Sequence, residues 1–139
     1  MPLERSMSDT DPQRNLQIVK TMTENGILGR WDIVKPLVAD DLVMYVPEGL
    51  PYGGTYRGWQ GYLDIFAAMG KFWSEFSVGP SQFSTYENKV AVISHLKAKV
   101  ARTGNTISMP LAEVWEIRDG KVSVVTPFYF DTKLISDRS

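Results

Sequence analysis

Helix-like segments come first in this chain and strand-like segments follow, and this order restricts the fold more than any other feature. Apolar residues recur at helical spacing over residues 11–26 and again over 58–73. Runs rich in β-branched and apolar residues follow, with compact turn signals between them: 75–84, 89–101, 105–117 and 121–130. Such an order is typical of α+β proteins and argues against alternating βαβ units. We therefore predict a long, curved sheet that helices half cover.

Two shorter elements are expected between the two helices. Asp32 is placed to cap a short helix that has Pro36 near its first turn, and residues 41–46 form an apolar strand that Pro47 ends. A chain of 139 residues is long enough for one core and too short for two. We predict a flexible tail over residues 1–11 and a single domain over 12–139.

Composition excludes several classes of partner. The chain is 43% hydrophobic and 22% charged, as folded soluble proteins are. Its formal net charge of -1 provides no electrostatic footprint for a nucleic-acid backbone. No apolar run approaches the roughly 20 residues that cross a bilayer, and the first eleven residues lack a signal-peptide core. We expect a cytoplasmic protein that binds neither nucleic acid nor membrane.

The residue types that hold metals and nucleotide cofactors are scarce. The chain has no cysteine and one histidine, which excludes disulfides, thiolate nucleophiles and metal sites built from cysteine or clustered histidine. The glycines between residues 49 and 58 lack the spacing of a phosphate-binding loop. We therefore expect no metal and no cofactor.

Two motifs carry a resemblance to a known family. Residues 50–59 read LPYGGTYRGW, an aromatic turn between a strand-like run and a helix-like run, and residues 114–122 read VWEIRDGKV. Together they resemble the SnoaL-like polyketide cyclase branch of the nuclear transport factor 2-like superfamily. The resemblance implies an α+β cone-like barrel, with N-terminal helices packed on a strongly curved, mostly antiparallel sheet around a small apolar pocket. It also implies a homodimer, because sheets of this family commonly pack face to face.

The chain departs from the catalytic pattern of related ketosteroid isomerases. Those enzymes use a tyrosine hydroxyl, a carboxylate base and a protonated carboxyl group. At the corresponding positions this chain has Met22 and Val46 in place of the tyrosine and the base. Glu113 alone matches the third group, so the resemblance implies a different mechanism.

Glu113 is the strongest candidate catalytic residue. It is the single charge in the middle of an alternating apolar strand face formed by Met109, Leu111, Trp115 and Ile117. A carboxylate there has to be neutralised, paired or wetted by a cavity. Desolvation raises the pKa of a carboxyl group, which would make Glu113 a general acid or base near neutral pH. A position at a dimer interface, or a pair with a lysine, is the structural alternative.

His95 is the second candidate, and its position depends on one turn. A three-residue loop over 103–105 places His95 directly opposite Glu113. A two-residue loop places Leu96 there and turns His95 to the other face. The apolar alternation along residues 90–100 favours the second arrangement, whereas a comparison with limonene epoxide hydrolases favours an inward His95.

Aromatic residues complete the predicted site. Tyr45, on the first strand, could offer its hydroxyl to a carbonyl or enolate oxygen. Several others are expected to line an apolar pocket, although each could equally be part of the core: Tyr52, Trp59, Tyr62, Trp115 and Phe128.

Two functions fit these residues. The first is a cofactor-independent acid–base enzyme of cyclase or isomerase type, acting on a small hydrophobic carbonyl compound of polyketide or terpenoid kind. In it Glu113 moves a proton while Tyr45 or His95 polarises an oxygen. The second is a non-catalytic module that binds a small hydrophobic ligand or serves dimerisation.

Overall fold

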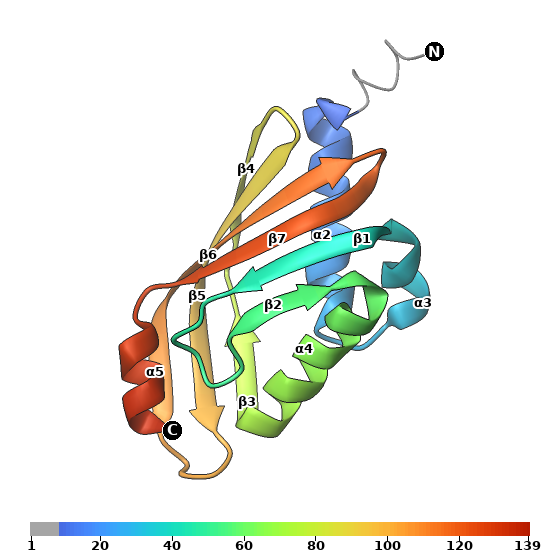
Figure 1. The fold of residues 1–139 in the computed structure, drawn as a ribbon. Helices are drawn as coiled ribbons and strands as arrows, with labels where there is room; N and C mark the ends of the chain where they lie inside the picture. The colour runs from blue at the N-terminus through green and yellow to red at the C-terminus, as the bar shows by residue number, and fades with distance from the viewer. Residues whose placement is uncertain (1–8) are drawn as a thin grey trace.

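A computed structural model describes residues 9–139 as helices packed on one strongly curled sheet (Figure 1). The first helix is α2, Pro12–Gly26. Its start follows from the sequence, because the Asp11 carboxylate accepts hydrogen bonds from the backbone N–H groups of Gln13 and Arg14, and Pro12 occupies the first turn. Val19 and Met22 on its inner face are buried in the core.

The described structure begins at Asp9, inside the segment that was predicted to be a tail. Residues 1–8 lie outside the described part of the chain, but Asp9 belongs to the fold. Its carboxylate oxygens accept hydrogen bonds from the backbone N–H groups of Asp119 and Gly120, at 3.1 and 3.3 Å. Both turn residues have positive φ, which presents their N–H groups together to one carboxylate.

The connection to the sheet is a short helix, α3 (Trp31–Val34), followed by a 3-10 turn, η1 (Lys35–Leu37). Asp32 lies in the first turn of α3 rather than at its cap, which is Arg30 and makes no side-chain capping bond. Pro36 falls within η1. The first strand, β1, therefore begins directly at Val38 and runs to Val46 (Val38–Val46).

The remaining elements follow the predicted order, with two additions. Their bounds are β2 Gly54–Arg57, α4 Gly58–Phe72, β3 Trp73–Val78, β4 Gln82–Tyr86, β5 Lys89–Val100, β6 Thr106–Arg118, β7 Lys121–Tyr129 and α5 Thr132–Arg138. The aromatic turn forms the short strand β2. The predicted strand over 75–84 is divided at Gly79–Pro80 into β3 and β4, which both pair with β5. The additional helix α5 is capped by Asp131, whose carboxylate accepts a hydrogen bond from Leu134 N at 3.0 Å.

The sheet has the order β2-β1-β7-β6-β5-β3, with β4 also on β5. Among the described strands β1 and β7 run parallel, and the other pairings are antiparallel. Register shifts interrupt β1/β7, β3/β5 and β6/β7, and such bulges increase the local twist and bend of a sheet. The sheet curls into a half-barrel, and α2 and α4 lie across its concave side (Figure 1). The predicted α+β class and mostly antiparallel sheet are confirmed.

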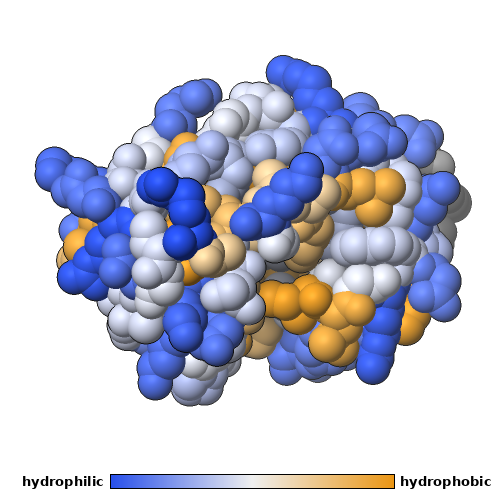
Figure 2. Space-filling model, turned by 90° about the horizontal axis from the view of Figure 1, so that it is seen from below, coloured by the Kyte–Doolittle hydropathy of each residue, from blue (hydrophilic) through white to orange (hydrophobic). Residues whose placement is uncertain are grey.

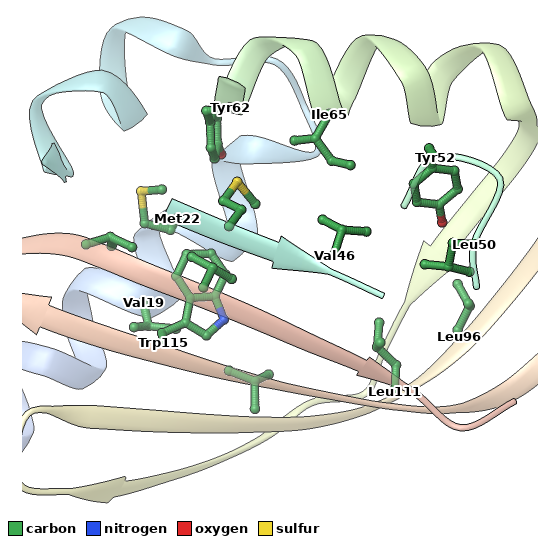
Figure 3. Close-up of a cluster of buried hydrophobic side chains, with 14 of the residues drawn as sticks. Val19, Met22, Val46, Leu50, Tyr52, Tyr62, Ile65, Leu96, Leu111 and Trp115 are labelled. Carbon is green, nitrogen blue, oxygen red and sulfur yellow. The ribbon is translucent and has the colours of Figure 1, made fainter. Parts of the chain in front are cut away.

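The hydrophobic core fills the space between α4 and the inner face of the sheet (Figure 3). Alternate residues of β5 and β6 face it, so that Val92 and Leu96 on one strand and Leu111 and Trp115 on the other are buried. Tyr62 enters from α4. None of the described helices is long and apolar enough to cross a membrane.

Candidate active site around Glu113

Glu113 lies on the inner face of β6, where the strand pattern predicted it. Its strand neighbours at i−2 and i+2, Leu111 and Trp115, point into the interior beneath α4 (Figure 3). Both are nearly inaccessible, whereas Glu113 keeps intermediate solvent exposure. The residue therefore keeps some exposed surface, while its carboxyl group is enclosed by core residues.

The environment of Glu113 favours its protonated form. Burial raises the pKa of this carboxyl, and a hydrogen bond from Trp115 Nε1 to Glu113 Oε1 opposes that rise. The bond is long, 3.4 Å, so its stabilisation of the carboxylate is weak. No ion pair joins Glu113 to a cation within residues 9–139. An acid with a raised pKa and no permanent counter-charge is suited to exchanging a proton with a substrate.

The hydroxyl groups of two tyrosines lie close enough to Glu113 for its negative charge to shift their pKa values. Burial raises the pKa of Tyr62, on α4, and that of Tyr129, on β7, and the negative charge of Glu113 raises both further. Neither hydroxyl forms a hydrogen bond with the carboxyl group in the described structure. Three groups that can carry a proton thus converge on one interior region.

A chain of hydrogen bonds leads from Tyr129 to the far end of the core. The hydroxyl groups of Tyr129 and Tyr52 are 2.9 Å apart, and Trp73 Nε1 donates to the Tyr52 hydroxyl at 3.0 Å. Burial raises the pKa of Tyr52, so this hydroxyl stays neutral. Tyr56 fixes the main chain beside it by donating its hydroxyl hydrogen to Tyr52 O at 2.7 Å.

The wall opposite the sheet is aromatic. Trp59 stacks on Tyr62 with 5.3 Å between ring centroids and 15° between planes. Trp31 meets both rings edge-on, at 6.0 and 5.8 Å. Phe66, one helical turn beyond Tyr62, lies 4.9 Å from it. Of the predicted wall residues, the structure places Tyr62 and Trp115 beside Glu113, whereas Trp59 packs on Tyr62 and lines a surface hollow. Tyr52 is linked to this region through Tyr129.

The prediction that His95 or Leu96 faces Glu113 is wrong. The partner of Glu113 on β5 is Val92, and His95 pairs with Pro110. His95 points to the outer face of the sheet, where its Nε2 is 2.7 Å from Ser108 Oγ, so it does not belong to the Glu113 site.

The register differs because the loop between β5 and β6 is longer than either predicted turn. The strands separate after Val100 and rejoin at Thr106, and Gly104 N donates back to Val100 O at 2.8 Å. Thr103 and Asn105 donate side-chain hydrogen bonds to Arg138 O, at 3.1 and 3.0 Å, which holds the loop against α5. No sequence pattern marks α5 as a docking surface for this loop.

Tyr45 and Phe128 also lie outside the site, contrary to their predicted roles. Alternation along β1 buries Met44 and Val46, which leaves Tyr45 on the convex face with 48% of its surface exposed. Phe128 is 55% exposed because its neighbour Pro127 takes the inward position opposite Glu113. The predicted contribution of both side chains to an inner pocket is wrong.

Sequence reasoning missed Tyr129 and Trp73. Alternation places Val125, Pro127 and Tyr129 on one face of their strand but does not say which face that is. Choosing that face required the pairing between β6 and β7, in which Glu113 opposes Pro127. Trp73 gave no comparable signal, because it stands at the junction of α4 and β3.

Two hollows open on the surface, and neither is lined by Glu113. One, of about 630 Å³, lies between α3, the start of β1 and α4, with Trp31, Trp59 and Lys35 in its wall. The other, of about 540 Å³, lies beside the outer side of Tyr52, with Lys71 and Arg102 at its border. Figure 2 views the molecule from below, where orange hydrophobic side chains are exposed among blue hydrophilic ones.

In the described part of the chain, no three His, Cys, Asp or Glu side chains come together as a metal site.

Comparisons with known proteins agree with this architecture. The family model for the SnoaL-like domain matches residues 28–125. A nuclear transport factor 2-like protein from Burkholderia xenovorans LB400 has a TM-score of 0.86 at 22% identity, with 93% of this chain and 98% of that chain covered. No curated protein matches the chain.

Two further solved structures share the fold. TerC, co-crystallised with polyporic acid, has a TM-score of 0.79 at 19% identity, with 90% of this chain and 97% of that chain covered. A proposed polyketide cyclase from Xanthomonas campestris pv. campestris has a TM-score of 0.78 at 18% identity, with 92% and 98% covered. Since the family model spans well over half of its length, the chain belongs to the SnoaL-like domain family.

Proposed function

We propose that this protein is a cofactor-independent acid–base enzyme of cyclase or isomerase type, acting on a small hydrophobic carbonyl compound of polyketide or terpenoid kind. The observation that carries the proposal is the carboxyl of Glu113 enclosed beside the aromatic rings of Tyr62 and Trp115, with its pKa raised by burial. In such a site the carboxylate removes a proton from the carbon next to a carbonyl, and the carboxylic acid returns it at another position.

The surroundings of Glu113 support a neutral, apolar substrate. Tyr62 and Trp115 offer flat apolar surfaces beside it, and no cation pairs with the carboxyl within the described residues. Among the structural neighbours, the proposed polyketide cyclase and TerC with polyporic acid are in keeping with this class of compound.

Hydrogen–deuterium exchange tests the proton transfer even while the natural substrate is unidentified. Small aryl and cyclic ketones are incubated with the protein in D₂O, and NMR follows loss of the protons next to the carbonyl. We expect catalysed exchange of at least one ketone, with a rate that rises with pH as Glu113 ionises. Glu113→Gln should lower that rate about 100-fold or more.

Glu116→Gln is the matched control, because Glu116 lies on the same strand as Glu113, and its cross-strand neighbour on β5 is Lys89 rather than Val92. Equal rates for the wild type and Glu113→Gln would refute a catalytic role for Glu113. Exchange by neither protein, with the ketones bound, would favour the alternative of a ligand-binding module.

We also propose that the protein is a homodimer joined through the convex face of the sheet. The supporting observation is a row of apolar side chains that crosses neighbouring strands, Phe128 on β7, Ala112 on β6 and Ile93 on β5. Phe128 and Ile93 are 55% and 52% exposed, and Phe130 beside them is 74% exposed. Exposed apolar side chains that lie side by side in this way are typical of an interaction surface.

A charge in the middle of that row should separate the subunits. We expect light scattering after size-exclusion chromatography to give twice the 15.7 kDa chain mass for the wild type and the single chain mass for Ile93→Arg. Tyr86→Arg is the control, because Tyr86 is even more exposed than Ile93 but lies at the end of β4. A monomeric wild type would refute the dimer.

A further inference from the structure

The hydrogen-bond chain beneath α4 has a direction. The indole of Trp73 can only donate, so its bond to the Tyr52 hydroxyl at 3.0 Å occupies a lone pair of the Tyr52 oxygen. The Tyr52 hydroxyl is also 2.9 Å from that of Tyr129, and either oxygen could supply the hydrogen of this second bond. The choice decides which tyrosine keeps a hydrogen for another partner.

The need of each hydrogen for an acceptor favours one choice when a ligand is bound. If Tyr129 donated to Tyr52, the hydrogen of Tyr52 would need another acceptor, and none contacts this hydroxyl among residues 9–139. Tyr52 is only 6% exposed, so water does not replace the acceptor. A buried donor without a partner costs about 1–3 kcal/mol. With an acceptor atom of a ligand beside Tyr129, the order Trp73 to Tyr52 to Tyr129 gives all three hydrogens an acceptor, and Tyr129 then donates its own to the ligand.

Tyr129 and Glu113 are diagonal neighbours on adjacent strands. Tyr129 pairs with Leu111, and Glu113 pairs with Pro127, on the same inner face. Such diagonal positions are about 7–8 Å apart, close enough for both side chains to reach one ligand atom. No hydrogen bond joins the two groups directly, so the Tyr129 hydrogen is not committed to the carboxyl.

We propose that Tyr129 donates this hydrogen to a carbonyl or enolate oxygen of the ligand, and that Trp73 and Tyr52 are positioning residues that fix its direction. This proposal rests on the proposed function and defines its substrate further, as a compound with an acceptor oxygen next to the carbon that Glu113 deprotonates. It assigns to Tyr129 the oxygen-polarising role that Tyr45 and His95, on the other face of the sheet, cannot perform.

A pair of nearly isosteric probes isolates this hydrogen bond. Acetophenone carries an acceptor oxygen and ethylbenzene does not, so the ratio of their dissociation constants, measured by NMR titration, reports the bond rather than the shape of the site. We expect the wild type to prefer acetophenone and Tyr129→Phe to reduce that preference about tenfold. Tyr52→Phe should reduce it several-fold, because it leaves Tyr129 without its donor.

A loss of packing would weaken both probes equally and leave the ratio unchanged. Tyr56→Phe is the matched control, since it removes a hydroxyl that contacts the main chain of Tyr52 outside the hydrogen-bond chain. In the wild type, the indole N–H resonance of Trp73 should shift with acetophenone and remain in place with ethylbenzene. This readout needs no variant and therefore does not depend on one folding.

The outcomes separate this proposal from the proposed function. An unchanged ratio in Tyr129→Phe would overturn the role of Tyr129, even if ketone exchange still required Glu113. A ratio that falls in Tyr129→Phe and Tyr52→Phe would support the hydrogen-bond chain, even if no ketone exchanged its protons. Failure of the wild type to prefer acetophenone would overturn the donor role directly.

Discussion

Replacing Glu113 by glutamine should make the folded protein more stable at neutral and alkaline pH. The side chain keeps its length and an oxygen that can accept the hydrogen bond from Trp115 Nε1, but it loses the charge that burial disfavours. The 3.4 Å length of that bond leaves most of the desolvation cost of the carboxylate without compensation. We expect a gain of at least about 1 kcal/mol in the free energy of unfolding at pH 8.

The sign of the pH dependence follows from the raised pKa of Glu113. Between its ordinary value of 4.5 and its higher value in the folded protein, the native state holds a proton that the unfolded chain has released. The wild type therefore loses stability as the pH rises through this window, by about 1.4 kcal/mol for each unit by which the pKa is raised. Below the window Glu113 is neutral in both states, and the charge-dependent advantage of the glutamine variant disappears.

Urea unfolding followed by tryptophan fluorescence, from about pH 4 to 8, measures this difference. The difference between the wild type and Glu113→Gln should grow with pH, and Glu116→Gln again controls for removing one carboxylate from β6. At pH 8 the gain corresponds to a rise in melting temperature of about 3 °C or more. A difference that stays constant across the pH range would show that Glu113 is well solvated and would refute the reasoning.

Two other sites give tests of the same structure. Trp115→Phe removes the donor that lowers the pKa of Glu113, so NMR titration should find that pKa higher in the variant; an unchanged value would exclude the bond. Gly53→Ala should destabilise the fold by about 2 kcal/mol or more, because the added Cβ would overlap the backbone oxygen of Pro47. Gly70→Ala should stabilise the fold by about 0.5–1 kcal/mol, because Gly70 lies in an exposed turn of α4 with open space around it. Thermal unfolding should therefore give a higher melting temperature for Gly70→Ala than for Gly53→Ala, and the reverse order would contradict the packing described.

Periodicity carried most of the fold prediction. The helices around Met22 and Tyr62 and the three long strands were predictable because each segment repeats apolar residues over three or more turns or alternations. Short elements were not predictable in this way. β2 comprises four residues and depends on pairing with β1, and α5 depends on the capping carboxylate of Asp131 and on Ile135 reaching the core.

The candidate site was predictable only one strand at a time. Glu113 could be assigned to the inner face from its own alternating neighbours. The position of His95 relative to it required the loop between β5 and β6, and that loop is set by contacts of Thr103 and Asn105 with α5, more than thirty residues away in the chain. Tyr129 could not be found for the same reason, since its contribution depends on pairing between strands.

Strand β6 carries the carboxyl group on one side and part of the apolar row on the other, with Ala112 and Val114 directly flanking Glu113. Deleting or inserting a single residue before this position would turn Ala112 or Val114 to the inner face of the sheet and Glu113 to the outer face. This segment can therefore accept substitutions that keep its length, whereas an insertion or deletion would reverse the two faces of the strand. The register shift between Glu116 and Ile117 is the exception, because the pairing with β7 already accommodates an irregularity there.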